Sequence, residues 1–192
     1  MHYLWARQAC RLVTLTRYRR RAKPARRLAI YGPFRIVNLA DAERWLLQLW
    51  NAARGSRRLP PRRAFQPEDL RPWLPHIGIV EIVQPGRRFR VKLAGTQIVV
   101  YDGSDLTGRF FDEILPPEVY AGFIVPYETA IATRQPWIDD LRYHEPAHSL
   151  EMPQSTYLPV RRIILPCADD GETVDRFVVA LFGYRPDDPI EP

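Results

Sequence analysis

Five short segments with strand character, interrupted by one helical stretch, constrain the fold of this chain most strongly. The clearest is 88–93, where apolar residues alternate with basic ones, so one strand face is apolar and the other is solvated. The segment before it, 77–83, is a β-branched apolar run typical of a strand buried on both faces. The other three expected strands are 137–143, 156–165 and 176–184.

Two longer helices are expected around these strands. The first covers 39–54, where apolar residues recur at helical spacing and include two tryptophans, and Gly55 suits its left-handed end. The second begins at Pro117, a residue that favours the first turn of a helix, and Pro126 is expected to kink or divide it.

This order of elements predicts a small α+β domain. Two consecutive strands, a helical crossing and three more strands describe a five-stranded antiparallel sheet with flanking helices, which we expect on one face of the sheet. The helical middle and that face would enclose the core. We divide the chain into a basic N-terminal extension (1–37), the domain with its leading amphipathic helix (38–186) and a short tail (187–192).

Charge is distributed very unevenly along the chain. Residues 1–37 carry ten basic side chains and no acidic one, whereas the remainder carries 18 basic and 22 acidic residues. Because residues 38–192 carry a net negative charge, they do not attract polyanions. Contact with nucleic acid or an anionic membrane is therefore expected only through the extension. The extension itself is open to three interpretations: a disordered basic tail, an over-extended start of the chain, or a surface-binding basic helix.

The sequence contains no apolar run long enough to span a bilayer, and arginines interrupt the N-terminus before a signal-peptide core could form. We therefore expect a cytoplasmic protein. Cys10 and Cys167 do not indicate a disulfide framework, and no zinc-ligand spacing is present. His144 and His148 are four residues apart, but Pro146 prevents a helix from presenting both to one metal, so no metal site is predicted.

The stretch LAGTQIVVYDGSDLTGRFFDEI (93–114) concentrates glycine, serine, threonine and aspartate. Its glycines lack the spacing and the following lysine of a phosphate-binding loop, and its carboxylates lack the pattern of an EF-hand. Gly95 instead suits the end of the second strand, Thr96 can cap a short helix through Tyr101, and Gly103 can close that helix.

This stretch resembles the segment of PAS domains that follows the second strand and leads into a Gly-Arg pair. The runs LPPRRAFQPEDLRPWLPHIGIVEI and ILPCADDGETVDRF resemble a PAS subgroup of single-domain proteins common in alphaproteobacteria. The resemblance covers about residues 38 to 184. It implies the PAS fold, a bacterial protein, and a role in sensing, signal transduction or protein interaction.

The resemblance leaves the cofactor unknown. Flavin photoreceptors of this fold carry a cysteine shortly after the Gly-Arg pair, whereas Phe110 and Phe111 follow Gly108-Arg109 here, so the sequence argues against a flavin adduct. Haem sensors need an axial histidine on the helical side, and the histidines of this chain fall on expected loops or strand edges. The sequence therefore argues against haem as well.

The candidate site residues are aromatic and no catalytic residue is predicted, because no spaced nucleophile motif is present. If a ligand pocket exists, its expected lining is Tyr101, Phe110, Phe111, Phe123, Tyr127, Trp137 and Phe182, although the same residues are typical of a core. On the leading helix, Trp45, Leu49 and Trp50 indicate either a dimer or partner surface or packing on the chain's own sheet.

The first function hypothesis is a non-catalytic PAS-type regulatory module that binds a small ligand or a protein partner. The alternative is a nucleic-acid or membrane-surface adaptor that acts through residues 1–37.

Overall fold

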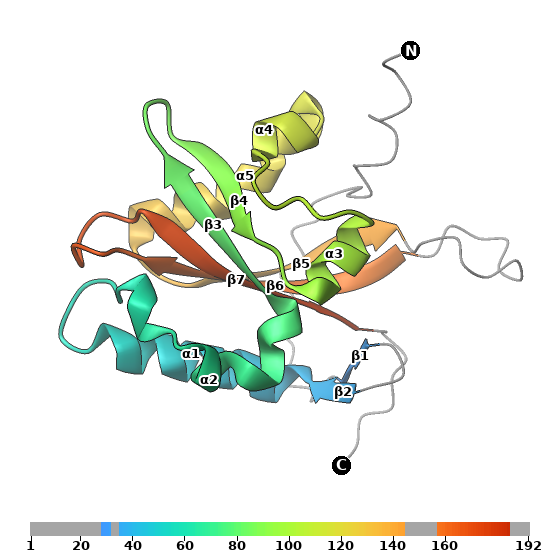
Figure 1. Ribbon diagram of the computed structural model, residues 1–192, viewed down its shortest axis with the longest axis horizontal. Coiled ribbons are helices and arrows are strands. Elements are labelled where there is room, and N and C mark those ends of the chain that lie inside the picture. The colour runs from blue at the N-terminus through green and yellow to red at the C-terminus, as the bar shows by residue number, and fades with distance from the viewer. Residues whose placement is uncertain (1–27, 32–34, 145–156, 185–192) are drawn as a thin grey trace, which may run out of the picture.

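The computed structural model describes residues 28–31, 35–144 and 157–184. Its centre is a five-stranded antiparallel sheet with the strand order β4-β3-β7-β6-β5 (Figure 1). The strands are β3 (Ile77–Val83), β4 (Arg88–Leu93), β5 (Trp137–His144), β6 (Tyr157–Cys167) and β7 (Arg176–Gly183). The expected fold class, an α+β domain built on such a sheet, is confirmed.

Helices surround the sheet. The α-helices are α1 (Leu39–Arg54), α2 (Pro67–Leu70), α3 (Thr96–Asp102), α4 (Phe111–Ile114) and α5 (Pro117–Thr133). In the described part of the chain, 3-10 helices cover Arg62–Ala64 and Arg71–His76. The segment α5 is assigned as one helix, with Pro126 inside it, so this proline does not divide the helix.

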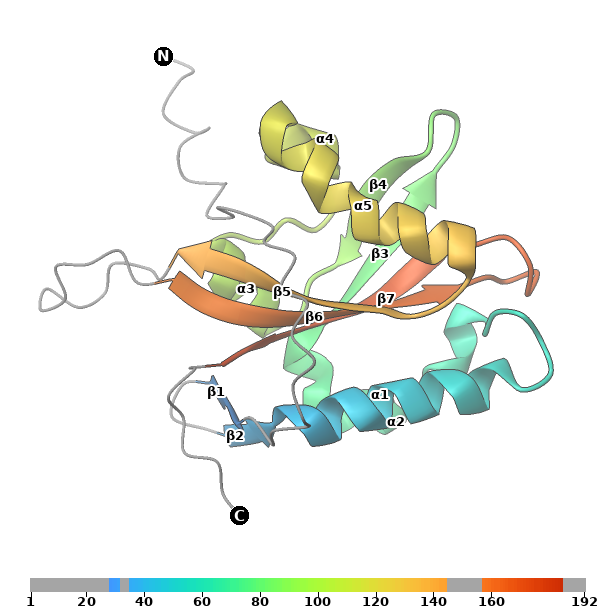
Figure 2. The ribbon, with the colours of Figure 1, turned by 180° about the vertical axis from the view of Figure 1, so that it is seen from behind.

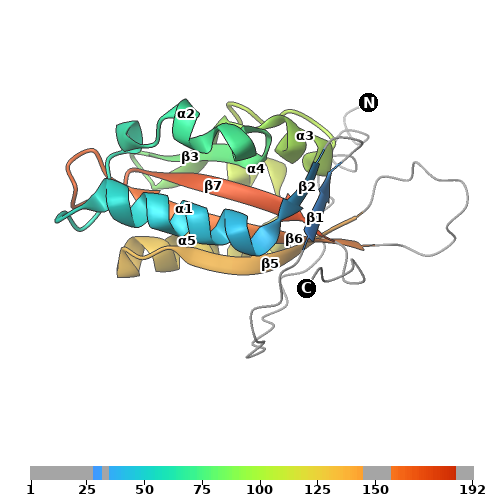
Figure 3. The same cartoon turned by 90° about the horizontal axis from the view of Figure 1, so that it is seen from below.

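Both faces of the sheet are covered, which corrects the expectation of helices on one face only. Figures 2 and 3 show α1 running along one face, while α5 lies on the other. The physical reason is visible in β7, where seven consecutive residues are buried and no solvated face alternates with the apolar one. Such a strand needs a packed layer on each side, and α1 supplies the second layer.

The helix α1 is held on its face by apolar and polar contacts. Leu46 and Trp50 are buried, and the Trp50 indole N–H donates a hydrogen bond of 2.8 Å to the Pro166 carbonyl on β6. The Arg161 guanidinium of β6 donates to the Glu43 carboxylate of α1 at 2.8 Å. These contacts fix the position of α1 on the sheet.

A second, two-stranded ladder precedes α1. Strand β1 (Leu28–Tyr31) pairs antiparallel with β2 (Arg35–Asn38), and β1 lies near β7. Part of the expected basic extension therefore has strand structure, which the charge pattern gave no reason to expect. Residues 1–27 and 32–34 lie outside the described residues, as does the tail 187–192.

Helix α3 begins where the chain approaches the 3-10 helix Arg71–His76 very closely. A Cβ atom on Gly95 would lie 2.4 Å from the Pro75 carbonyl oxygen and 2.7 Å from that of Ile77, so no larger residue fits there without a backbone shift. Gly103 ends the helix with a φ of 73°, the left-handed conformation expected at such a C-cap. The two glycines thus set where α3 starts and stops.

Candidate ligand pocket

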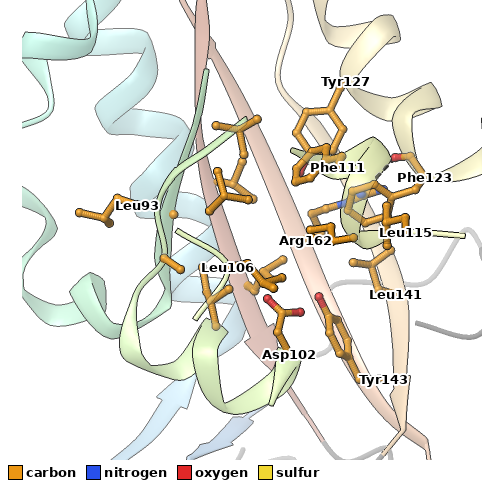
Figure 4. Close-up of a pocket in the computed structure, with 18 residues that line it drawn as sticks. Leu93, Asp102, Leu106, Phe111, Leu115, Phe123, Tyr127, Leu141, Tyr143 and Arg162 are labelled. Atoms are coloured by element: carbon orange, nitrogen blue, oxygen red, sulfur yellow. Dashed lines mark hydrogen bonds between the residues drawn. The ribbon is translucent and has the colours of Figure 1, made fainter. Parts of the chain in front are cut away.

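A cavity of about 70 Å³ lies between the sheet and the helices α3, α4 and α5 (Figure 4). Fourteen apolar residues line it: Gly78, Val80, Val91, Leu93, Ala94, Ile98, Leu106, Phe111, Ile114, Leu115, Phe123, Leu141, Val179 and Leu181. Its four remaining lining residues are Asp102, Tyr127, Tyr143 and Arg162. An apolar cavity with a few convergent polar groups is the usual form of a small-molecule site.

The strand register explains how the sheet residues reach this cavity. Leu141 and Tyr143 stand two apart on β5 and so share a face. Leu181 of β7 pairs with Arg162 of β6, which pairs in turn with Asp139 of β5. Three neighbouring strands therefore direct side chains to the α5 face of the sheet at the same level.

The most deeply buried polar group of the pocket is the Arg162 guanidinium. Its Nε donates to Asp139 Oδ1 at 2.8 Å and its Nη2 donates to Oδ2 at 2.6 Å, which is a bidentate pair. Its Nη1 lies 3.5 Å from the Phe123 carbonyl oxygen of α5, as drawn in Figure 4. Burial alone would lower the pKa of Arg162, but hydrogen bonding and the charge of Asp139 outweigh it, so the pKa is raised. The arginine therefore stays charged and joins the sheet to α5.

Asp102, the last residue of α3, is the second polar group of the pocket. Its carboxyl and the Tyr143 hydroxyl point toward each other in Figure 4. Burial raises the pKa of Asp102 to about 7, and hydrogen bonding from Tyr143 opposes this rise without cancelling it. Burial, followed by the charge of Asp102, also raises the pKa of Tyr143 well above its usual value. The Tyr143 hydroxyl thus stays protonated at neutral pH, whereas Asp102 titrates there.

Three of the seven aromatic residues expected to line a pocket do so: Phe111, Phe123 and Tyr127. They form an aromatic cluster in which the Phe111 and Phe123 ring centroids are 5.1 Å apart and meet edge to face. Tyr127 packs beside both rings. These three residues therefore belong to the hydrophobic core and also line the pocket.

The other four expected aromatic residues do not line the cavity. Tyr101 packs against Tyr143 with ring centroids 5.7 Å apart, and the Tyr101 hydroxyl oxygen accepts a hydrogen bond of 2.8 Å from the Gly183 amide. The Arg88 guanidinium lies over the ring of Phe110, with 3.8 Å between the guanidinium carbon and the ring centroid. Both belong to the surroundings of the pocket and not to its wall.

Phe182 and Trp137 lie away from the cavity because of their positions on β7 and β5. Phe182 follows Leu181 on β7, so it points to the opposite face, where its ring stacks on His76 at 4.8 Å. Trp137 shares the face of Tyr143 but begins β5, six residues or roughly 20 Å away along the strand. Its indole nitrogen is buried and without a hydrogen-bond partner in the described part of the chain.

The expected pocket lining did not include the polar residues Asp102, Tyr143 and Arg162, which the structure places there. Asp102 lies in the stretch 93–114, whose carboxylates lack the pattern of an EF-hand, and no local pattern distinguishes Tyr143 or Arg162. One signal was available: the Asp139-Asp140 pair on one expected strand and the Arg161-Arg162 pair on the next. Opposite charges at matching positions of neighbouring strands indicate cross-strand pairing.

The three residues named for a partner surface are placed differently from one another. Trp50 is 1% exposed and packs on the chain's own sheet, so its side chain is not part of an exposed surface. Trp45 is 45% exposed, packs against Trp73, and donates to the Asp69 carbonyl at 3.3 Å. Leu49 is partly buried against the core.

The described residues offer little for metal or thiol chemistry. No group of three or more metal-ligating side chains occurs among them. Cys167 is fully buried, and burial raises the pKa of its thiol to about 12, so no reactive thiolate forms near neutral pH. Within the same residues, no helix has the length and apolar character required to cross a membrane.

The fold that carries this pocket occurs in a known protein family. A model of the PAS domain family matches residues 40–181, which is most of the chain. The chain belongs to the PAS domain family. This confirms the resemblance found in the sequence, and it indicates a sensory signalling module. No curated protein matches the chain.

Several solved structures of light-oxygen-voltage (LOV) domains are similar to this chain. A Rhodobacter sphaeroides LOV protein is 13% identical with a TM-score of 0.43, and the match covers 59% of this chain and 61% of that protein. A LOV domain studied with a flavin analogue is 10% identical, with a TM-score of 0.42 and coverage of 62% and 84%. The Aureochrome1 LOV domain in its light state is 12% identical, with a TM-score of 0.41 and coverage of 62% and 89%. This chain thus spans about three fifths of the length of the Rhodobacter protein.

The residues around the pocket do not fit a flavin nucleotide. Within the described part of the chain, the lining contains no cysteine, asparagine or glutamine, and its one cation, Arg162, is already paired with Asp139. A cavity of about 150 Å³ is known to hold a single benzene ring. The cavity here is about half that volume, too small for a three-ring system in the described arrangement.

Proposed function

We propose that this protein is a non-catalytic PAS-type sensory or regulatory module that binds a small ligand in the cavity between the sheet and α3–α5. The observation that carries the proposal is the composition of that cavity. Among the described residues, it is walled mainly by apolar side chains and contains one carboxyl group, Asp102, which the Tyr143 hydroxyl faces as its hydrogen-bond partner. A polar group in a largely apolar cavity is a point at which a ligand can be recognised and oriented.

The described surroundings of the cavity favour binding over catalysis. The lining residues that the structure describes include no serine, threonine, cysteine, lysine or histidine, so among them no nucleophile stands beside a base. Asp102 alone could exchange a proton, but nothing placed next to it would attack a substrate. A protein contact through α1 remains the second candidate activity, and the exposed half of Trp45 supports it. The adaptor role of residues 1–37 and the cytoplasmic location stay predictions, since the extension lies mostly outside the described residues.

The proposal is tested by closing the pocket at its mouth. Leu106 lines the cavity and is itself partly exposed, so Leu106→Trp obstructs access with little effect on the core. Val100→Trp is the matched control, because Val100 is a nearby residue of α3 that is 56% exposed and does not line the cavity. Each protein is purified under native conditions, examined by native mass spectrometry for a co-purified small molecule, and screened against a fragment library by ligand-observed NMR.

We expect binding to the unmodified protein and to Val100→Trp, and its loss in Leu106→Trp. Equal binding by the two variants, or no binding by the unmodified protein, would reject the pocket as a ligand site.

A further inference from the structure

The described polar groups of the pocket can still accept hydrogen bonds from a ligand, whereas most of their donors are already used. Among the described lining residues, Arg162 is the only strong donor, and Asp139, the Phe123 carbonyl and the Tyr127 hydroxyl already engage its guanidinium. A ligand therefore meets an arginine whose donors are mostly used and whose charge is neutralised at contact distance. An anionic or purely acceptor ligand gains little from such a group.

Asp102 provides the free acceptors. An ionised carboxylate has about four lone-pair positions, and within the described residues the only hydrogen-bond donor facing it is the Tyr143 hydroxyl. A tyrosine hydroxyl that donates its proton to Asp102 can in addition accept a hydrogen bond from a ligand. These two oxygen-bearing groups come from α3 and β5 and meet at one end of the cavity (Figure 4).

Among the described residues, no unpaired positive charge near Asp102 and Tyr143 would favour the binding of an anion. The ionisable groups that act on Asp102 and Tyr143 are Arg162 of β6, paired with Asp139 of β5, and Tyr127 of α5. The described part of α3 contributes only Asp102 itself as a charged side chain. The rest of the lining is apolar, so a ligand needs one polar end and an apolar body.

On the basis of the proposed function, we propose that the pocket selects a small amphipathic amine: an ammonium or other hydrogen-bond donor placed between Asp102 and Tyr143, with a short aliphatic body among Leu106, Leu141 and Leu181. The ammonium supplies three donors to a site that lacks them, and it compensates the carboxylate charge that the apolar walls leave poorly solvated. The raised pKa of Asp102 agrees with this arrangement, because it reports how poorly the free carboxylate is stabilised. A cavity of about 70 Å³ suits a chain of a few carbon atoms and not an aromatic ring.

Three probes of equal length separate charge from shape: n-butylamine, n-butanol and butyrate. Each is titrated at pH 8, where Asp102 is ionised, into protein carrying labelled Leu, Val and Ile methyl groups, and binding is followed by methyl NMR shifts of the cavity residues. The unmodified protein is compared with Asp102→Asn, which keeps the shape and an acceptor for Tyr143 but removes the charge. Asp105→Asn is the matched control, since Asp105 is exposed, three residues further on, and does not line the cavity.

We expect n-butylamine to bind at least tenfold more tightly than n-butanol, and butyrate to bind most weakly. Asp102→Asn should remove the preference for the amine over the alcohol, whereas Asp105→Asn should retain it. If n-butanol or butyrate binds as tightly as n-butylamine, or if Asp102→Asn keeps the preference, the amine proposal is wrong while the ligand pocket stands. If none of the probes shifts the cavity methyls, the amine proposal fails, and the Leu106→Trp comparison decides separately whether the pocket is a ligand site. A thermal melt of each variant verifies that it is folded.

Discussion

Asp139 and Arg162 stand directly opposite each other on β5 and β6, and their side chains form a bidentate ion pair in which the arginine is fully buried. The next pair of the same ladder, Asp140 and Arg161, points to the other face, where Arg161 also binds Glu43 of α1. One strand register therefore provides each face of the sheet with a charged pair. Arg162 of the first pair lines the pocket, and Arg161 of the second pair contacts the helix on the opposite side.

We expect Asp139→Asn to destabilise the protein strongly, because it leaves the charge of Arg162 buried without a counter-ion. Loss of one partner of a buried pair costs about 3–5 kcal/mol. Asp140→Asn makes the same chemical change one residue along, but Arg161 is partly exposed and keeps Glu43 as a partner, so its cost should be about 1 kcal/mol or less. Urea unfolding of both variants measures the difference, and equal costs would show that the buried pair is not critical.

The two tryptophans of α1 should respond differently to removal. Trp50 is buried and donates a hydrogen bond across to β6, so Trp50→Ala is expected to cost about 3–5 kcal/mol of unfolding free energy. Trp45 is half exposed and contacts mainly Trp73, so Trp45→Ala should cost about 1 kcal/mol. Thermal or urea unfolding with the same probe for both variants measures these values.

The exposed half of Trp45 also tests the predicted partner surface. If α1 mediates a dimer, light scattering should give a dimer mass for the unmodified protein and a monomer mass for Trp45→Ala at equal concentration. The unmodified protein behaving as a monomer at all concentrations would exclude a homodimer through this helix.

Local burial patterns account for what the sequence could predict. The segments 39–54 and 77–83 coincide with α1 and β3, because each carries a regular apolar period that depends only on neighbouring residues. The same reasoning predicted the five-stranded sheet. It failed to predict the second covering layer, since an apolar period identifies a buried face without showing which element covers it.

The polar centre of the pocket depends on contacts that no local pattern contains. Asp102, Tyr143 and Arg162 come from α3, β5 and β6, and they meet only once the register of β5 against β6 is set. The prediction for Phe182 failed for a related reason. Strand β7 is buried on both sides, so its sequence does not show which of its two faces borders the cavity. Pairing information, such as the Asp-Asp and Arg-Arg dipeptides, is the part of the sequence that would have helped.

The start of α3 should be intolerant of even a methyl group. Gly95→Ala places a Cβ against two backbone carbonyls that cannot rotate away, and such overpacking is expected to cost about 3 kcal/mol. Gly108→Ala is a useful control, because its φ is +84° and the space around it is open, so only backbone strain of about 1 kcal/mol is added. Unfolding midpoints of the two variants in urea should differ accordingly, and a Gly95→Ala protein as stable as Gly108→Ala would contradict the close approach.

The pH dependence of stability should carry the signature of Asp102. Its pKa is about 7 in the folded protein and near 3.8 when unfolded, so between these values the folded state binds the extra proton. The contribution of this group to stability is therefore most favourable below pH 4, declines as the pH rises to about 7, and is constant above that. Because Asp102 is only partly buried, solvent screening reduces the decline to on the order of 3 kcal/mol.

Asp102→Asn removes this titration. We expect the difference in unfolding free energy between Asp102→Asn and the unmodified protein to become more favourable to the variant by roughly that amount between pH 4.5 and pH 8. The comparison of two proteins cancels the carboxylates that they share. Asp105→Asn again serves as control: hydrogen bonding from Thr107 lowers the pKa of this exposed carboxyl, so its variant should gain nothing with rising pH. A constant difference for Asp102→Asn over the whole range would show that this carboxyl is ionised in the pocket at no cost, and would remove the physical basis for its selection of a cation.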